Sequence, residues 1–187
     1  MVFIIAINMI TDEESIEEPI DLEKNDEKEI TPEPKYNEVE IVIDTDIYSN
    51  YFNNEHNDET IENVIELIER AAKSVSPSGE VKIPKDKNLN SFFTYSNDEL
   101  LGLFQKNNDN SQGELIMVVA DKPFALQQAA DLIEDEQIDK DLNYLADELF
   151  KIEFYQISDF AEFSTAYEKY VDIQKKILKI YYTIEYM

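Results

Sequence analysis

Carboxylates are the residues of this sequence whose type and spacing could do chemistry. They are densest in segment 11–35, TDEESIEEPIDLEKNDEKEITPEPK, where Lys24 and Lys28 are the only basic residues before Lys35. The candidate partner-binding acids of this segment are Asp12, Glu13, Glu14, Glu17, Glu18, Asp21, Glu23, Asp26, Glu27 and Glu29. Duplex DNA carries about one charge per 1.7 Å of its axis, so a protein that occupies a nucleic-acid-binding cleft needs a comparable row of fixed anions.

A second acidic run lies at the start of a predicted helix. Its candidate partner-binding residues are Glu134, Asp135, Glu136, Asp139 and Asp141, and Asp147 and Glu148 continue the run. Carboxylates three and four residues apart on a helix lie about 5–6 Å from one another, which makes a ladder of negative charge. Such a ladder steers a basic partner toward the protein, so both acidic runs predict a surface that binds a basic protein.

The whole chain shares this charge. Its 187 residues include 42 acidic and 16 basic side chains, for a formal net charge of -26. Apolar residues make up 43 % of the chain, which is enough to build a core, so the acidity does not imply general disorder. Free nucleic acid and anionic membranes are poor partners for such a protein. A highly charged surface that serves solubility alone is the plainer interpretation.

Several kinds of site are excluded by residue counts. The chain has no Cys, so it holds no disulfide, catalytic thiol or Cys-based zinc site. His56 is the only histidine, and three glycines leave no phosphate-cradling loop. The absence of Cys suits a reducing cytoplasm, which is a host cytoplasm if the protein is viral. The apolar start, MVFIIAINMI, is too short to span a bilayer and lacks the features of a signal peptide, so a strand is expected there.

Asp44 and Asp46 form a possible metal site. They follow an apolar stretch at i and i+2, a spacing that lets both carboxylates approach one hard cation such as Mg²⁺ or Mn²⁺. The alternative is structural, because Asp at the end of a strand commonly accepts hydrogen bonds from nearby backbone N–H groups. Asp121 has an equally ordinary interpretation as a helix N-cap.

Three short segments resemble the PIN-domain nucleases: VIDTDIYSNYF, FFTYSNDELLGL and IMVVADKPF. The resemblance implies an opening strand that ends in a metal-binding Asp, a second acidic segment, and a last strand followed by a later acid. It would make Asp44, Asp46, Glu99 and Asp121 the ligands of a catalytic divalent metal. Glu99 lies farther from Asp44 than this family usually separates the two, and the overall charge would repel a nucleic-acid substrate.

The elements that must position these residues are predicted to form an α+β protein: a small mixed sheet with flanking helices, an acidic N-terminal segment and a C-terminal helical hairpin. Runs of apolar and β-branched residues predict strands, and amphipathic periodicity predicts helices. The expected strands are 2–10, 38–43 and 114–120, with short candidates at 81–83 and 91–95. The expected helices include 58–75, a short one after Ser96 or Asn97, and 121–134 with Pro123 in its first turn; residues 47–57 are expected to form a loop.

The C-terminal part predicts two long helices. Ile138, Leu142, Leu145, Leu149 and Ile152 repeat at four, three, four and three residues, which makes one apolar stripe. A break at 156–158 precedes a second helix, with Ser158 or Asp159 as its cap. Its tyrosines are expected to lie mostly in the core, and a homodimer through these helices is the alternative.

The predicted organisation is an N-terminal strand (1–10), an acidic segment (11–36), an α/β core (37–136) and a helical hairpin (137–187). The leading function is a non-enzymatic acidic inhibitor without a cofactor, which mimics nucleic-acid charge and blocks the basic cleft of a nucleic-acid-binding protein. In charge and size it is similar to phage anti-restriction and anti-CRISPR proteins and to immunity proteins of nuclease toxins. The alternatives are a divalent-metal-dependent PIN-like nuclease and an acidic structural or assembly protein.

Overall fold

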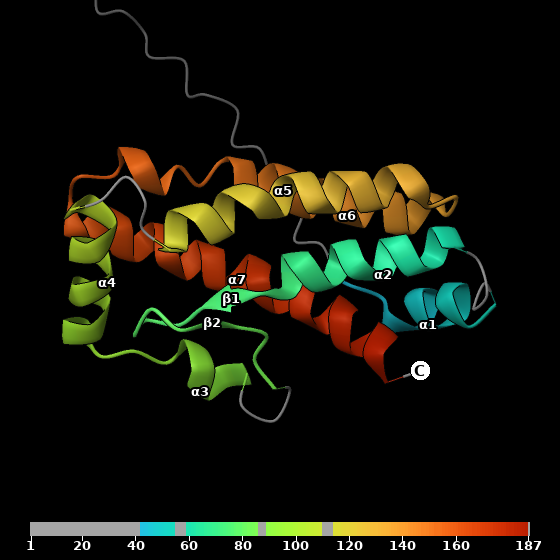
Figure 1. Cartoon of the computed structure of the whole chain (residues 1–187), viewed down its shortest axis with the longest axis horizontal. Coiled ribbons are helices and arrows are strands. Elements are labelled where there is room, and N and C mark those ends of the chain that lie inside the picture. Colours follow the sequence, from blue (N-terminus) through green and yellow to red (C-terminus); the bar gives the residue numbers. More distant parts are fainter. Residues whose placement is uncertain (1–41, 55–58, 86–88, 110–113, 187) are drawn as a thin grey trace, which may run out of the picture. The chain divides into compact units, whose positions relative to one another are not determined.

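Helices dominate the described part of this protein (Figure 1). The computed structural model describes residues 42–54, 59–85, 89–109 and 114–186, and 78 % of these residues are helical. All of them belong to one unit, 40–187. The predicted strand 2–10, the acidic segment 11–36 and most of the predicted strand 38–43 lie outside the described residues.

Seven α-helices and one short 3₁₀ helix are described. The α-helices are α1 (Thr45–Asn54), α2 (Glu59–Ala72), α3 (Leu89–Phe93), α4 (Asn97–Asp109), α5 (Glu114–Leu132), α6 (Glu136–Phe150) and α7 (Phe160–Glu185). The 3₁₀ helix η2 (Phe154–Gln156) lies between α6 and α7. The strands are β1 (Ser74–Val75) and β2 (Val81–Lys82).

The sheet of the described residues is a single two-stranded antiparallel hairpin, smaller than the predicted mixed sheet. Ser74 pairs with Lys82, and Val75 pairs with Val81. Gly79 adopts a positive φ of 87°, which a residue without a Cβ tolerates, and its N–H donates to the carbonyl of Ser76 at 2.8 Å. The predicted short strand at 81–83 is therefore confirmed, whereas the other strand predictions that fall on described residues are wrong.

The largest correction concerns residues 114–120, which form the first two turns of α5 and not a buried strand. An apolar run of this length does not by itself distinguish a strand from a buried helix. Leu115, Val119 and Leu126 are all buried at helical spacing, which packs one side of a continuous helix against the core. Pro123 therefore lies inside α5 and not in a first turn, and Asp121 is not a helix cap.

Two shorter predictions are also wrong. In place of the strand predicted at 91–95, the helix α3 covers Leu89–Phe93. In place of the loop predicted at 47–57, the helix α1 covers Thr45–Asn54. The reason in α1 is tertiary burial, because Tyr48 and Phe52 are fully buried one helical turn apart and outweigh the low helix propensity of the Asn residues between and after them.

The predictions for the remaining helices are confirmed. The helix expected at 58–75 is α2, although it ends at Ala72 and its last two predicted residues form β1, and the helix expected after Ser96 is α4. Ser96 and Glu99 form a reciprocal capping box: the Ser96 N–H donates to Glu99 Oε2 at 2.8 Å, and the Glu99 N–H donates to Ser96 Oγ at 3.3 Å. Asp159 is the N-cap of α7 and accepts from the N–H groups of Ala161 and Glu162.

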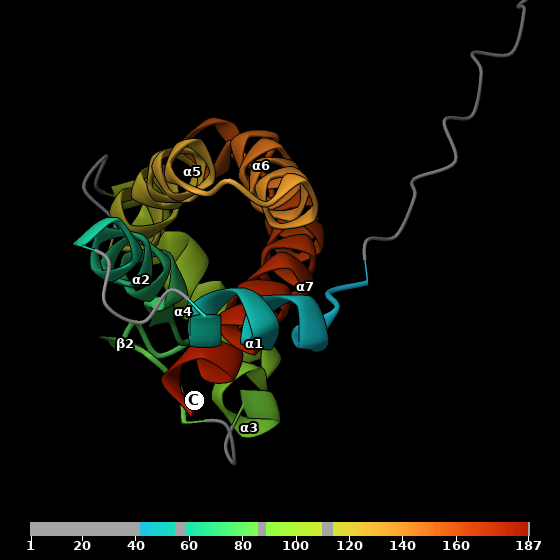
Figure 2. The same cartoon turned by 90° about the vertical axis from the view of Figure 1, so that its right-hand side faces the viewer.

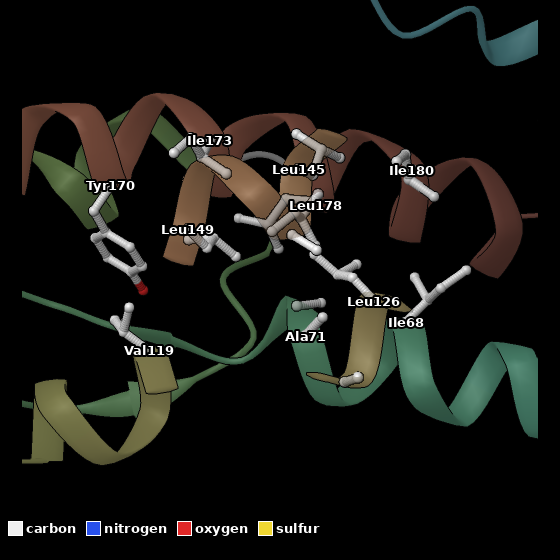
Figure 3. Close-up of a cluster of buried hydrophobic side chains, with 14 of the residues drawn as sticks. Ile68, Ala71, Val119, Leu126, Leu145, Leu149, Tyr170, Ile173, Leu178 and Ile180 are labelled. Atoms are coloured by element: carbon white, nitrogen blue, oxygen red, sulfur yellow. The ribbon is translucent and has the colours of Figure 1, made fainter. Parts of the chain in front are cut away.

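The core of the described unit lies between α2, α5, α6 and α7, which surround it in the end-on view of Figure 2. The helix α6 packs most extensively against α5, while α7 contacts α1, α2, α4 and α6. Figure 3 shows side chains from four helices meeting there, among them Ile68, Leu126, Leu149 and Tyr170. Because Tyr167 and Tyr170 are fully buried within the single chain, they are not available to a homodimer interface.

Candidate functional site

Acidic side chains gather where the start of α2 meets the turn between α5 and α6. Arg70, near the end of α2, forms an ion pair with Asp121 in the first half of α5. Asn63, near the start of α2, lines a groove together with Asp131 and Leu132 at the end of α5. The two helices are therefore antiparallel, and the N-terminus of α2 lies beside the α5–α6 turn, toward the right of Figure 1.

The helix α1 joins the same end of the unit. The Tyr48 hydroxyl donates to Asp141 Oδ2 at 3.2 Å, and the Glu134 N–H donates to the Tyr51 hydroxyl at 3.4 Å. These two hydrogen bonds place α1 beside the beginning of α6. The acidic beginnings of α1 and α6 and that of α2 thus lie at the same end of the described unit, on either side of the α5–α6 turn (Figure 2).

We call this surface the acidic end. It comprises Asp44, Asp46, Glu59, Glu62, Glu66, Asp131, Glu134, Asp135, Glu136 and Asp139. All ten are exposed or partly exposed. Within 44–46, 59–66 and 131–140 the sequence holds one basic residue, Lys140, which donates to Glu136 Oε1 at 2.6 Å and lowers the pKa of that carboxyl. The acidic end is therefore strongly negative.

Four of the five predicted residues of the second acidic run belong to the acidic end. Glu134 and Glu136 are exposed. Asp135 is the N-cap of α6 and accepts from the N–H groups of Gln137 and Ile138 at 2.9 and 3.0 Å. Asp139 accepts from Asn143 Nδ2 at 2.7 Å. Negative charges in a first helical turn are favoured by the helix dipole, which offsets part of the repulsion between these acids.

The prediction that the fifth residue, Asp141, contacts a partner is wrong. It is 1 % exposed, because it lies on the side of α6 that also buries Ile138 and Leu145. Its carboxylate accepts from Gln137 Nε2 at 2.8 Å and from the Tyr48 hydroxyl, which leaves no surface for a partner. Burial raises the pKa of Asp141, and these two hydrogen bonds oppose that shift.

The sequence prediction missed Asp131 and the α2 glutamates of the acidic end, and Glu69 continues these glutamates along the helix. Glu59, Glu62, Glu66 and Glu69 are exposed and follow one another at spacings of three, four and three residues. They therefore form a ladder along one side of α2, away from the buried Ile61, Val64 and Ile68. Their spacing of three and four residues is visible in the sequence and could have identified them, because it places them opposite the apolar stripe of the same helix.

A groove between α2 and α5 continues the acidic end. It encloses about 550 Å³ and is lined by Asn63, Glu66, Leu67, Arg70, Gln128, Asp131 and Leu132. Its single basic residue, Arg70, is engaged by Asp121, and this hydrogen-bonded pairing lowers the pKa of the Asp121 carboxyl. The groove thus combines two apolar side chains, Leu67 and Leu132, with the carboxylates of Glu66 and Asp131, which take no part in this pairing.

Lys122 is the most unusual ionisable residue of the described unit. It is 1 % exposed, and its Nζ donates to the carbonyl oxygens of Ala71 and Lys73 at the end of α2. Burial lowers the pKa of Lys122 to about 7, against a smaller opposite effect of the Asp121 carboxylate. Because its amine faces backbone carbonyls within the core, Lys122 holds α2 to α5 and does not face a groove.

The residues of the possible metal site lie on three different elements. Asp44 Oδ1 accepts from the Asp46 N–H at 3.0 Å at the start of α1, Glu99 belongs to the capping box of α4, and Asp121 pairs with Arg70. No group of three or more His, Asp or Glu residues among those described is placed to hold a metal ion. The PIN-like segments that imply an opening and a last strand belong to α1 and α5.

The partner-binding acids predicted between Asp12 and Glu29 lie outside the described residues and stay a prediction. Among the helices that the structure describes, none combines the length and apolar character needed to cross a membrane. Comparisons of this chain with models of protein families, with curated proteins and with solved structures gave no match.

Proposed function

We propose that this protein is a non-enzymatic binding protein that blocks the basic cleft of a nucleic-acid-binding protein. The observation that carries the proposal is the acidic end, where carboxylates from α1, α2, α5 and α6 are brought onto one surface. Like charges kept together repel one another and lower stability, so their clustering calls for a compensating role. Binding to a cationic surface is such a role, because bringing positive charge to these carboxylates relieves the repulsion.

The mechanism is occupation of the cleft. The α2 ladder presents one or two carboxylates per helical turn, about 5–6 Å apart, in place of the phosphates that the partner normally contacts. The groove beside it offers apolar contact through Leu67 and Leu132, next to the carboxylates of Glu66 and Asp131. Charge steers the encounter and selects basic partners, while apolar contact adds the part of the affinity that salt does not screen.

The experiment compares two variants that remove equal charge from different helices. The first carries Glu59→Gln, Glu62→Gln and Glu66→Gln in α2, and the control carries Glu162→Gln, Glu168→Gln and Asp172→Asn in α7. All six side chains are exposed; Glu59 and Glu62 of the α2 set and Glu162 of the α7 set belong to the first turn of their helices. The two proteins therefore differ in where the charge is lost and not in how much.

Immobilised wild-type protein is used to recover binding proteins from a cell lysate, and each recovered protein is then tested for competition by duplex DNA. We expect a basic nucleic-acid-binding protein that 0.5 M salt releases and that DNA displaces. Its affinity should fall at least about tenfold for the α2 variant and change little for the α7 control. Equal losses for both variants, or binding that neither salt nor DNA affects, would contradict the proposal.

A further inference from the structure

Large apolar side chains are exposed together on the side of α5 that faces η2. Met117 and Phe124 of α5, Phe150 at the end of α6 and Tyr155 in η2 are between 43 and 66 % exposed. The Phe124 and Phe150 rings meet edge to face with centroids 5.3 Å apart. Isolated exposed apolar residues are ordinary, but a gathered set beside a groove marks an interaction surface.

The groove at this place is apolar and small. It encloses about 220 Å³ and is lined chiefly by Ile116, Pro123, Phe124, Phe150, Phe154 and Tyr155. Sites for drug-sized ligands usually measure about 300–1,000 Å³, so this groove is better matched to one or two side chains of a partner protein. We call it the aromatic groove.

Pro123 removes one helical hydrogen bond beside the groove. Proline has no N–H, so it cannot donate the usual helical hydrogen bond to the carbonyl of Val119, which also lines the groove. Aromatic residues that protrude around a preformed apolar recess have the composition of binding hot spots in protein interfaces.

The charges around the aromatic groove are mainly negative. Glu153 lines the groove and is exposed, and the exposed Asp147 lies one helical turn before Phe150. The nearby Lys151 and Lys169 both pair with Glu148, so these lysines are engaged while Glu153 and Asp147 form no ion pair with them. The aromatic rings add electron-rich faces to which Lys and Arg side chains are attracted.

From these observations we infer that the aromatic groove binds a basic segment of a partner protein that inserts one or two large apolar side chains between Phe124 and Tyr155. Lys or Arg residues beside the inserted side chains contact Glu153 and Asp147. A second copy of this chain is disfavoured as the occupant, since each copy carries a net charge of -26 and the two repel one another. The inference rests on the proposed function, because it identifies a second apolar contact of the same basic partner, in addition to the groove between α2 and α5.

Three synthetic peptides of equal length test this inference on the full chain at about 150 mM salt. One contains Leu and Lys in an amphipathic helical pattern, the second replaces Leu with Ser, and the third replaces Lys with Glu. Calorimetry measures their affinities for the wild type and for Phe124→Gln, Phe150→Gln and Glu153→Gln. Tyr186→Gln is the matched control, because Tyr186 is 71 % exposed and lies at the C-terminal end of α7.

We expect the Leu/Lys peptide to bind at least about tenfold more tightly than the Ser/Lys peptide, and the Leu/Glu peptide not to bind. Phe124→Gln and Phe150→Gln should each weaken Leu/Lys binding about fivefold or more, Glu153→Gln should weaken it less, and Tyr186→Gln should leave it unchanged. Both phenylalanines are substantially exposed, so the variants should fold, and circular dichroism checks this.

Equal affinity for the Leu/Lys and Ser/Lys peptides, or no effect of Phe124→Gln, would overturn the inference. Self-association in sedimentation experiments that Phe124→Gln abolishes would overturn it in favour of a second copy. The α2 variant separates the two proposals. If it loses affinity for both basic peptides while the phenylalanine variants do not, the groove inference fails and the acidic-end proposal stands. The reverse pattern supports the groove and contradicts the acidic end.

Discussion

Lys122 and Ala71 are joined by a hydrogen bond between a buried side chain and the end of a neighbouring helix. The Lys122 Nζ lies 2.5 Å from the Ala71 carbonyl oxygen and also donates to the carbonyl of Lys73. The last carbonyls of a helix have no partner within that helix, so α5 supplies donors where α2 ends. Gln174 of α7 donates to the Ala71 carbonyl as well, at 3.2 Å, so three helices meet at this oxygen.

The substitution Lys122→Met should destabilise the protein by about 1–3 kcal/mol at pH 9, because it removes the donors to these carbonyls. A neutral lysine keeps two N–H groups, one for each carbonyl, so the wild type satisfies both without a buried charge. Urea unfolding followed by circular dichroism measures the difference. The exposed Lys140→Met is the control and should change the free energy of unfolding little.

The stability of the wild type should also depend on pH through Lys122. Its pKa is about 7 in the folded protein and near 10.5 when unfolded, so between these values the unfolded state binds more protons. The free energy of unfolding contributed by this residue therefore rises from pH 7 upward. The destabilisation by Lys122→Met should be smaller at pH 6 than at pH 9. If Lys122→Met destabilises the protein equally at pH 6 and pH 9, the assignment of a lowered pKa to Lys122 is contradicted.

The substitution Asp141→Asn should stabilise the protein by roughly 1 kcal/mol at pH 7, because it removes a buried charge. The new amide oxygen still accepts from the Tyr48 hydroxyl, and the exposed Gln137 can turn its amide so that its oxygen accepts from the new N–H₂ group. Burial raises the pKa of Asp141 in the folded state, so the wild type loses stability as the pH rises through that pKa. The gain should vanish below about pH 4, where the carboxyl is protonated in both states.

Thermal unfolding at pH 3.5 and pH 7 measures this effect, with the exposed Asp147→Asn as the control. A lower melting temperature at pH 7 for Asp141→Asn would show that the charged form is the stabilising one and that its hydrogen bonds outweigh the cost of burial. The control should change the melting temperature little at either pH.

The substitution Glu62→Lys should raise stability and weaken partner binding at the same time. It replaces the repulsion of Glu62 with Glu59 and Glu66 by attraction between the new lysine and both glutamates, which is worth about 0.2–0.5 kcal/mol per pair at low salt. The same change places a positive charge within the acidic end. Chemical unfolding and the affinity for the basic partner are both measured at low and high salt. A variant that is more stable and binds as well as the wild type would contradict the role of the acidic end.

Two substitutions of Asp44 distinguish a helix-capping role of this residue from a metal-binding role. As the residue before α1 it accepts from the Asp46 N–H, so Asp44→Ala should cost about 0.5–2 kcal/mol, whereas Asp44→Asn should cost little. A metal ligand would behave differently, because both substitutions would weaken Mg²⁺ binding. Calorimetric titration with Mg²⁺ and unfolding of the three proteins are the measurements. A Mg²⁺-dependent gain in stability that Asp44→Asn abolishes would favour the nuclease alternative.

Periodicity alone predicts the helices that carry one apolar side. In α2, α6 and α7 the apolar residues recur at three and four residues, and these positions are the ones that become buried, as Ile61, Ile138 and Phe163 illustrate. Local capping chemistry is readable in part: Ser96 and Asp159, each one of two candidate caps, cap their helices, whereas the candidate cap Asp121 lies inside α5. These features depend on neighbours within one or two helical turns.

Besides the short α3, two helices could not be predicted in this way. The run ELIMVVA at the start of α5 has the composition of a buried strand, and Pro123 suggests a new beginning where the helix continues. Low-propensity residues make α1 resemble a loop, although Tyr48 and Phe52 are held in the core. In both cases burial against other helices outweighs the local preference of the chain.

The charge, the amphipathic helices and the local caps follow from the sequence alone, because they depend on residue types and short spacings. Which charges lie together depends instead on tertiary packing. The antiparallel packing of α2 on α5 brings Glu66 beside Asp131, and the inward side of α6 removes Asp141 from the surface. Packing also buries Lys122 and gathers Phe124 and Phe150 around one groove. Contacts between residues distant in the chain arise from how the apolar sides of the helices meet, which no short stretch of sequence specifies.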